Sequence, residues 1–283
     1  MHGTGVLTRT SILPPDIQLG RRHFQTSAAI LAGVLCLGAA GCGREQAGKP
    51  RELTVAAAAN LNAVLEEIGK AFTLQTQTRV LFSYASTAQL TQQIKNGAPF
   101  DLFLAADTEH VDQLIEQRKV LPDSRAIFAR GRLVLWVPPE SPADIRRLED
   151  LLKPGVRMIA AASPGSAPYG RAAVETLKAM GLWRRVERKI VYANNVNLAR
   201  QYAASGNAEA AFTAYSLVLQ AGGHIVEVDP ANHHPLEQAL GIVTGSPNQE
   251  PARRFVRFLQ NGEGAALLEK YGYGVPGRIK PHR

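Results

Sequence analysis

The chain has 283 residues, of which 45% are hydrophobic and 20% charged, so it can bury a real core as one large or two medium domains. The formal net charge is +8, but Lys and Arg are scattered, which favours a solvated basic surface over a nucleic-acid-binding face. The only two cysteines, Cys36 and Cys42, lie near the N-terminus, which excludes disulfides, thiolate metal sites and cysteine nucleophiles from the rest.

Residues 1–42 have the pattern of a signal peptide. Arg21 and Arg22 precede an apolar run, Ala28–Ala40, which is shorter than the roughly 20 residues needed to span a bilayer. Small residues then precede Cys42, as in lipoprotein signals, where the cysteine becomes the lipidated first residue. Ordinary signal-peptide cleavage near Ala40 is the alternative, and both Sec and twin-arginine export stay open. We expect a periplasmic protein, anchored to the membrane if Cys42 is lipidated.

Residues 43–51 are polar with Gly and Pro, which predicts a flexible tether. Beyond them, apolar residues at helical spacing alternate with short apolar runs typical of strands. Asn60 and Ser216 are expected to cap helices, and two helices end the chain, Pro251–Gln260 and Gly264–Tyr271. The expected strands are Leu53–Ala57, Arg79–Tyr84, Asp101–Ala105, Arg132–Val137, Val156–Ala161, Lys189–Ala193, Glu209–Ala214, His224–Val228 and Gln238–Thr244.

This alternation predicts an α/β protein with two doubly wound lobes. The set of strands divides near Val137, and the last strand and helices return to the first half. We therefore assign 52–136 and 240–283 to lobe 1 and 137–239 to lobe 2, with a double crossover and a ligand cleft between the lobes. Ligands of such sheets bind beyond the carboxyl ends of the strands.

Four strand-to-helix turns carry candidate ligand contacts at Asn60, Thr87, Tyr169 and Val196, with Ala59 and Ser86 as further candidates. Each turn lies at a predicted helix start, where unpaired N–H groups and the helix dipole favour an anion. An amide, a hydroxyl and two backbone N–H groups would then bind the anion without Lys or Arg. Ordinary capping by the polar residues, and packing of Tyr169 and Val196, are the alternatives.

Four stretches carry a family resemblance: AAAANLNAVLEEIGKAF, SYASTAQLTQQIKNGAPFDLFLAAD, APYGRAA and ALGIVTGSPN. From Leu53 to about Pro276 the chain resembles the periplasmic molybdate-binding proteins of ABC importers. The resemblance implies a type II periplasmic-binding-protein fold. It also implies a monomer that captures molybdate or tungstate and delivers it to an ABC permease with its ATPase, without catalysis or a cofactor.

In that family the oxyanion is held through its oxygens, so no side chain binds the metal directly. The resemblance places these contacts at Asn60 and Thr87, and at the backbone N–H groups of Tyr169 and Val196. Many members add a tyrosine hydroxyl in the second lobe, where this chain has Ala214, with Tyr215 one position away. The Tyr169 hydroxyl is a candidate replacement.

Other functions are less compatible with the sequence. Capture of sulfate or another small anion is the alternative, whereas phosphate is disfavoured because the four turns contain no carboxylate to accept its proton. An enzyme is disfavoured because no P-loop, zinc-protease or nucleophile-elbow motif is present. The export signal, and the absence of a DNA-binding segment, argue against a transcription regulator and against any nucleic-acid partner.

Overall fold

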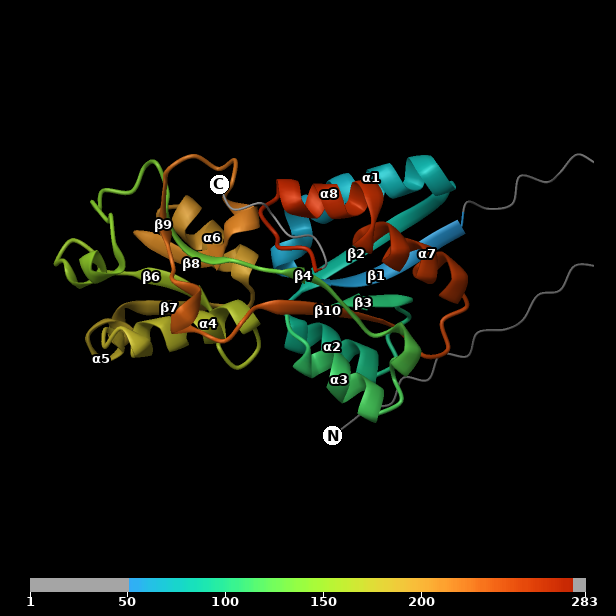
Figure 1. Ribbon diagram of the computed structural model, residues 1–283. Coiled ribbons are helices and arrows are strands. Elements are labelled where there is room, and N and C mark those ends of the chain that lie inside the picture. Colours follow the sequence, from blue (N-terminus) through green and yellow to red (C-terminus); the bar gives the residue numbers. More distant parts are fainter. Residues whose placement is uncertain (1–50, 277–283) are drawn as a thin grey trace, which may run out of the picture. The chain divides into compact units, whose positions relative to one another are not determined.

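Ten strands form two five-stranded sheets in the computed structural model, which describes residues 51–276 (Figure 1). The signal sequence, Cys42 and nearly all of the predicted tether lie outside the described residues. Arg51, assigned to the tether, is instead the first residue of β1. The strands are β1 Arg51–Ala58, β2 Thr78–Ala85, β3 Leu102–Leu104, β4 Ala126–Arg130, β5 Leu133–Val137, β6 Ile159–Ala162, β7 Ile190–Ala193, β8 Ala210–Ala214, β9 His224–Glu227 and β10 Glu237–Ile242.

The first sheet has the order β2-β1-β3-β10-β4, and the second has the order β7-β6-β8-β5-β9. In the first sheet β1 is parallel to β2 and β3, whereas β10 is antiparallel to β3 and β4. In the second, β6 is parallel to β7 and β8, whereas β5 is antiparallel to β8 and β9. The expected α/β class with two lobes is confirmed, because each sheet mixes parallel βαβ units with an antiparallel strand, β10 in the first sheet and β5 in the second.

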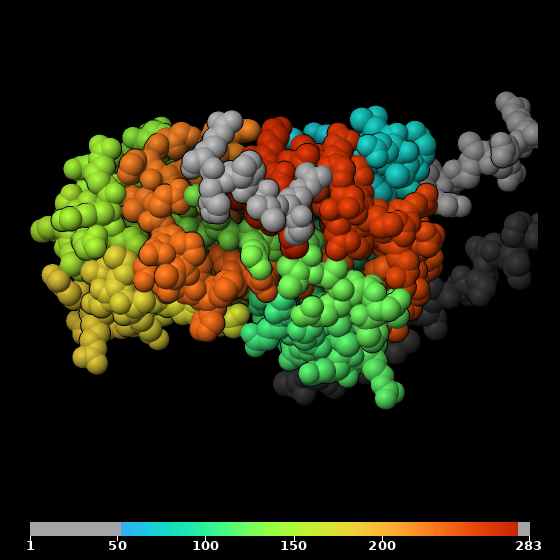
Figure 2. Space-filling model, viewed as in Figure 1, coloured from blue at the N-terminus to red at the C-terminus, as the bar shows by residue number. Residues whose placement is uncertain are grey.

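Helices cover both faces of each sheet. Along β1, Val55 belongs to the core that packs against α1, whereas Ala56 belongs to the core under α2 and α3, as strand alternation requires. Figure 2 shows the red α7 and α8 beside the cyan α1 on one surface. The helices are α1 Asn62–Thr76, α2 Thr87–Lys95, α3 Glu109–Glu116, α4 Pro168–Ala179, α5 Trp183–Val186, α6 Val196–Ala204, α7 Gln249–Gln260 and α8 Gly262–Lys270, with 3-10 turns η1 Ala59–Leu61, η2 Pro122–Ser124, η3 Leu148–Leu152, η4 Glu187–Lys189, η5 Tyr215–Leu217 and η6 Pro230–Asn232.

The chain crosses between the sheets at 131–132 and again at 228–236. We call 51–130 with 237–276 the first lobe and 133–227 the second lobe. The predicted bounds differ, because β5 had been placed in lobe 1 but pairs with β8 and β9 of the second sheet. Every residue of β5 is buried, so its apolar pattern carries no information about which sheet it joins. The sequence analysis also missed β4, which is separated from β5 by two residues.

Two predicted caps are wrong. Asn60 lies inside η1 and makes no capping hydrogen bond, since the N-cap of α1 is Leu61. Ser216 lies inside the short turn η5, and no α-helix follows it before β9 in the described residues. Both side chains are buried, and tertiary hydrogen bonds replace the local ones that a cap would make.

All described residues belong to one compact unit, Gln46–Arg283, which contains the apolar cores of both lobes. Asp101 stabilises its first lobe, since its carboxylate accepts hydrogen bonds from the Thr54 N–H at 2.7 Å and the Ser246 hydroxyl at 2.6 Å. None of the helices within 51–276 has the length and apolar character needed to cross a membrane.

Candidate functional site

One small cavity is lined by all four predicted turns. The space inside it for the centre of a water molecule is about 10 Å³, which is the scale of one water molecule. Its lining is contributed by both lobes and contains no charged side chain among the described residues. The lining residues are Ala58, Ala59, Asn60, Ala85, Ser86, Thr87, Ala106, Ala167, Pro168, Tyr169, Asn195 and Val196.

Helix starts converge on this cavity because each follows the carboxyl end of a strand. Thr87 and Val196 are the first residues of α2 and α6, Tyr169 is the second residue of α4, and Asn60 lies in η1, which leads into α1. At these positions backbone N–H groups have no acceptor within their own helix. The arrangement therefore supplies partial positive charge from four directions without any Lys or Arg.

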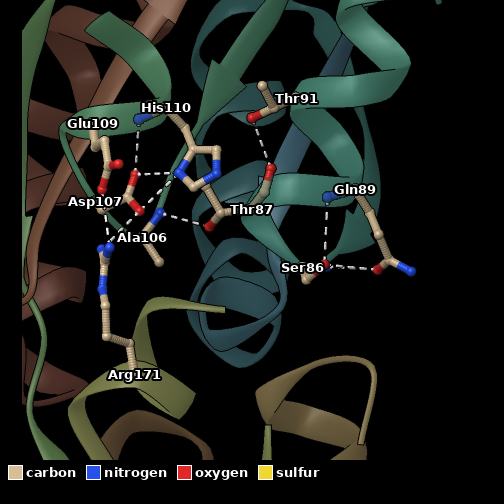
Figure 3. Close-up of polar contacts among 9 residues, drawn as sticks. All are labelled: Ser86, Thr87, Gln89, Thr91, Ala106, Asp107, Glu109, His110 and Arg171. Atoms are coloured by element: carbon tan, nitrogen blue, oxygen red, sulfur yellow. Dashed lines mark hydrogen bonds and ion pairs between the residues drawn. The ribbon is translucent and has the colours of Figure 1, made fainter. Parts of the chain in front are cut away.

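The Thr87 side chain is 1% exposed and presents a free donor. Its hydroxyl oxygen accepts the N–H of Ala106 at 3.2 Å, and its proton has no acceptor within residues 51–276 (Figure 3). Ser86 differs, because its hydroxyl donates to Gln89 Oε1 at 2.8 Å and accepts the Gln89 N–H at 3.4 Å in a capping box. Of the two neighbouring hydroxyls, only that of Thr87 keeps its proton available to a ligand.

The Asn60 amide has a different role from the one expected. Its Nδ2 donates to Gln238 Oε1 at 3.0 Å and to the Tyr273 hydroxyl at 3.1 Å, while Oδ1 is buried without a partner in the described part of the chain. The amide hydrogens are therefore used inside the protein. What this turn can still offer a ligand is the backbone N–H at the start of the helix, together with that of Ala59.

Behind the cavity, a buried polar network joins the two lobes. Gln238 Nε2 donates to the Tyr169 hydroxyl at 3.3 Å, and the Ser216 hydroxyl donates to the Asn60 carbonyl at 3.1 Å. The Tyr273 hydroxyl lies 2.9 Å from that of Ser216 and donates to the same carbonyl at 2.8 Å. Sequence reasoning missed Gln238, whose signal is a polar residue at a fully buried strand position.

Both network tyrosines are neutral at physiological pH. Desolvation by burial raises the pKa of Tyr169 well above its usual value and that of Tyr273 to about 12. Tyr215, considered as a ligand from its position near Ala214, does not line the cavity, and the Arg132 guanidinium lies 4.3 Å from its ring centroid. Among the described residues that line the cavity, Tyr169 is the one tyrosine.

Charged groups lie just outside the cavity. Asp107 follows the lining residue Ala106, and its carboxylate contacts His110 Nδ1 at 2.9 Å and Arg171 Nη2 at 3.5 Å (Figure 3). Asp107 also accepts the backbone N–H of His110 at 3.2 Å, which ties it to the first turn of α3. Because the lining has no charged side chain and presents donors at the helix starts, the site suits a small anion that accepts hydrogen bonds.

Comparisons with known proteins agree with this geometry. The family model described as bacterial extracellular solute-binding protein matches residues 53–274. The molybdate-binding protein ModA of Rhodobacter capsulatus is 33% identical over 89% of this chain and 96% of its own length. A putative ABC transporter substrate-binding lipoprotein of Bacillus subtilis, YvgL, is 30% identical over 83% and 92%. The structure of the periplasmic molybdate-binding protein of Azotobacter vinelandii has 32% identity and a TM-score of 0.75, covering 79% of this chain and 99% of its own.

Proposed function

The chain belongs to the bacterial extracellular solute-binding proteins, and on this basis we propose that it captures molybdate or tungstate and delivers it to an ABC importer. The observation that carries the proposal is the charge-free cavity lined by four helix starts. The relatives whose names specify molybdate align along most of both chains, which supports the same ligand class here.

The proposed contacts are the Thr87 hydroxyl and the backbone N–H groups of Asn60, Tyr169 and Val196. Ala59 is a further backbone candidate. Ser86 stays a further candidate by its position, although its hydroxyl and its backbone N–H both donate to Gln89 Oε1. Molybdate near neutral pH is a dianion that accepts hydrogen bonds through all its oxygens, so a ring of donors matches it. The metal itself would have no direct protein ligand.

Exclusion of phosphate follows from the same donor set. Near neutral pH phosphate retains a proton that needs an acceptor, and no Asp or Glu lines the cavity in the described chain. Leaving that proton unpaired costs about 1–3 kcal/mol. Sulfate has no such proton, so it remains the alternative ligand. It is a smaller dianion that could accept hydrogen bonds from the same donors.

Binding to oxyanions is the experiment that tests the proposal. The chain from Gly43 onward keeps the whole unit Gln46–Arg283, and its thermal unfolding would be followed with molybdate, tungstate, sulfate and phosphate at equal ionic strength. A ligand that binds only the folded state stabilises it by about 2.7 kcal/mol at a hundredfold excess over Kd. We expect shifts with molybdate and tungstate alone. A shift with sulfate alone would reassign the ligand, and no shift with any anion would refute oxyanion capture.

The importer and the location are proposed from the family. We expect the liganded, monomeric chain to stimulate ATP hydrolysis by a cognate permease–ATPase complex in lipid bilayers, and the free chain to stimulate it less.

We also expect lipidation of Cys42 at the outer side of the membrane, an arrangement supported by the lipoprotein among the relatives. Mass spectrometry of the mature N-terminus tests this, with Cys42→Ala as the control that should release the chain in soluble form.

A further inference from the structure

Arg171 reaches from the second lobe to two carboxylates of the first. It is the fourth residue of α4, and its Nη1 lies 2.9 Å from Glu109 Oε2 while its Nη2 lies 3.5 Å from Asp107 Oδ2. Figure 3 shows its side chain extended from α4 toward the start of α3. Tyr169 precedes Arg171 by two residues and Ala106 precedes Asp107, so the ion pair flanks cavity residues on both sides.

The first lobe does not need Arg171 for its own stability. Asp107 is 8% exposed, but it keeps partners within the first lobe, accepting the backbone N–H of His110 at 3.2 Å and contacting His110 Nδ1. Glu109 is largely exposed. Separation of the lobes would therefore leave no unpartnered buried carboxylate, and the contacts of Arg171 are available only when the lobes are close together.

A second contact between the two lobes lies near the starts of α2 and α4. The backbone N–H of Ala88, in the first turn of α2, donates to the carbonyl of Ser166 at 3.2 Å, just before α4. This bond also joins the two lobes, yet it has no charge and no side chain to vary. The buried bonds of Gln238 to Tyr169 and of Ser216 to Asn60 join the lobes behind the cavity, whereas Arg171 is an exposed, charged side chain through which the strength of closure can be tested.

We propose that Arg171 is a positioning residue that holds the lobes closed around the bound oxyanion and slows its release. The inference rests on the proposed function, since closure around a ligand is what the ion pair would stabilise. A contact made only in the closed state adds its free energy to that state alone. The guanidinium also offsets part of the negative charge of two carboxylates that lie beside the cavity.

Stopped-flow kinetics of molybdate binding to Arg171→Leu test the proposal. Exposed ion pairs contribute modestly, and Arg171 has two partners, so we expect dissociation to become about 2–10-fold faster. The association rate should change less than about twofold at physiological salt, where the Debye length is about 8 Å. Glu109→Gln should give a smaller increase in dissociation rate. In the double variant with Arg171→Leu, the change in activation free energy for dissociation should be less than the sum of the two single changes. Arg171→Lys, which keeps the charge, should restore part of the effect.

Arg253→Leu is the matched control. Arg253 Nη2 lies 2.7 Å from Asp123 Oδ2 with similar exposure, but both residues belong to the first lobe. Its removal deletes the same charge from the chain without touching an interlobe contact, so the kinetics of release should stay unchanged. Equal effects of the two variants, or a loss confined to the association rate of Arg171→Leu, would overturn the proposal in favour of a general electrostatic role.

A distance measurement separates this inference from the ligand assignment. Spin labels at Glu116→Cys in α3 and Ala179→Cys in α4 occupy exposed positions on the two lobes, in a chain from Gly43 that has no other cysteine. Without any ligand, Arg171→Leu should shift the distance distribution toward longer separations, and high salt should do the same to the parent. Unchanged distances would contradict closure by Arg171. Failure of molybdate to bind the parent chain would instead refute the proposed function.

Discussion

The hydroxyl oxygen of Thr87 accepts the backbone N–H of Ala106 at 3.2 Å, which ties the start of α2 to the chain just beyond β3. The bond fixes the orientation of the Thr87 side chain. It occupies the hydroxyl oxygen as an acceptor and leaves the hydroxyl proton free to be donated. In this geometry Thr87 is a pre-oriented hydrogen-bond donor at the cavity, whose rotamer need not be ordered when a ligand arrives.

Thr87→Val should weaken molybdate binding by about 10–100-fold, because a hydrogen bond to a charged ligand is worth about 1.5–3 kcal/mol. Titration calorimetry measures the loss, and Thr87→Ser should retain most of the affinity. The control is Thr91→Val, which removes an equally buried hydroxyl that donates to the Thr87 carbonyl at 2.9 Å. A similar loss of affinity in that control would show that the effect is structural.

Tyr169→Phe should lower stability but leave affinity within about threefold of the parent. The substitution removes the acceptor of the Gln238 amide and leaves a buried donor unpaired, at a cost of about 1–3 kcal/mol, whereas the backbone N–H assigned to the ligand remains. Denaturant unfolding and calorimetry on the same sample separate the two quantities. A tenfold or greater loss of affinity at unchanged stability would instead identify the hydroxyl as a ligand contact.

Gly131→Ala should disturb the crossover between the lobes. A Cβ at this position would overlap the Tyr169 hydroxyl and lie 2.8 Å from Gln238 Nε2, so the network behind the cavity would have to move. Overpacking of this kind costs about 1–3 kcal/mol. We expect lower thermal stability together with weaker molybdate binding. Gly155→Ala, which meets no atom within 4 Å, is the control and should match the parent in both measurements.

Stability should fall in acid because several carboxylates have lowered pKa values, among them the partly buried Glu67 and Glu209. The pKa of Glu67 is lowered by the hydrogen bond from Tyr271, at 2.6 Å, and then by that from Lys270. For Glu209 desolvation, the largest single influence, acts to raise the pKa, but the backbone N–H groups of Met158 and Arg157 with other donors outweigh it. A folded pKa below the ordinary value of 4.5 gives stability that is present above that pH and lost as the pH falls toward the folded pKa.

Urea unfolding between about pH 3 and 6 measures this loss. Glu209→Gln should be less stable than the parent near neutral pH, and the difference should shrink as the solution is acidified through this window. A difference that stays constant with pH would mean that the carboxylate of Glu209 is not the group whose titration destabilises the fold.

Local sequence signals predicted a helix start well where the capping side chain bonds to a backbone N–H of the same turn. Ser86 and Asn195 precede their helices and accept the N–H three residues on, at 3.4 Å and 2.9 Å, as capping residues do. Asn60 and Ser216 have the same kind of side chain at similar turns, yet their partners lie elsewhere. Nothing in the neighbouring residues distinguishes the two cases, because the outcome depends on what is packed against the turn.

The sequence by itself determined the α/β alternation and the four turns of the candidate site, because these depend on periodicity, short-range composition and family resemblance. Tertiary structure alone decided that β5 joins the second sheet, that Gln238 takes the Asn60 amide, and that Arg171 meets Glu109. Asn60 and Gln238 are 178 positions apart, and Arg171 and Glu109 are 62 apart. Such contacts form only after the sheets have brought distant segments together, and no local pattern encodes them.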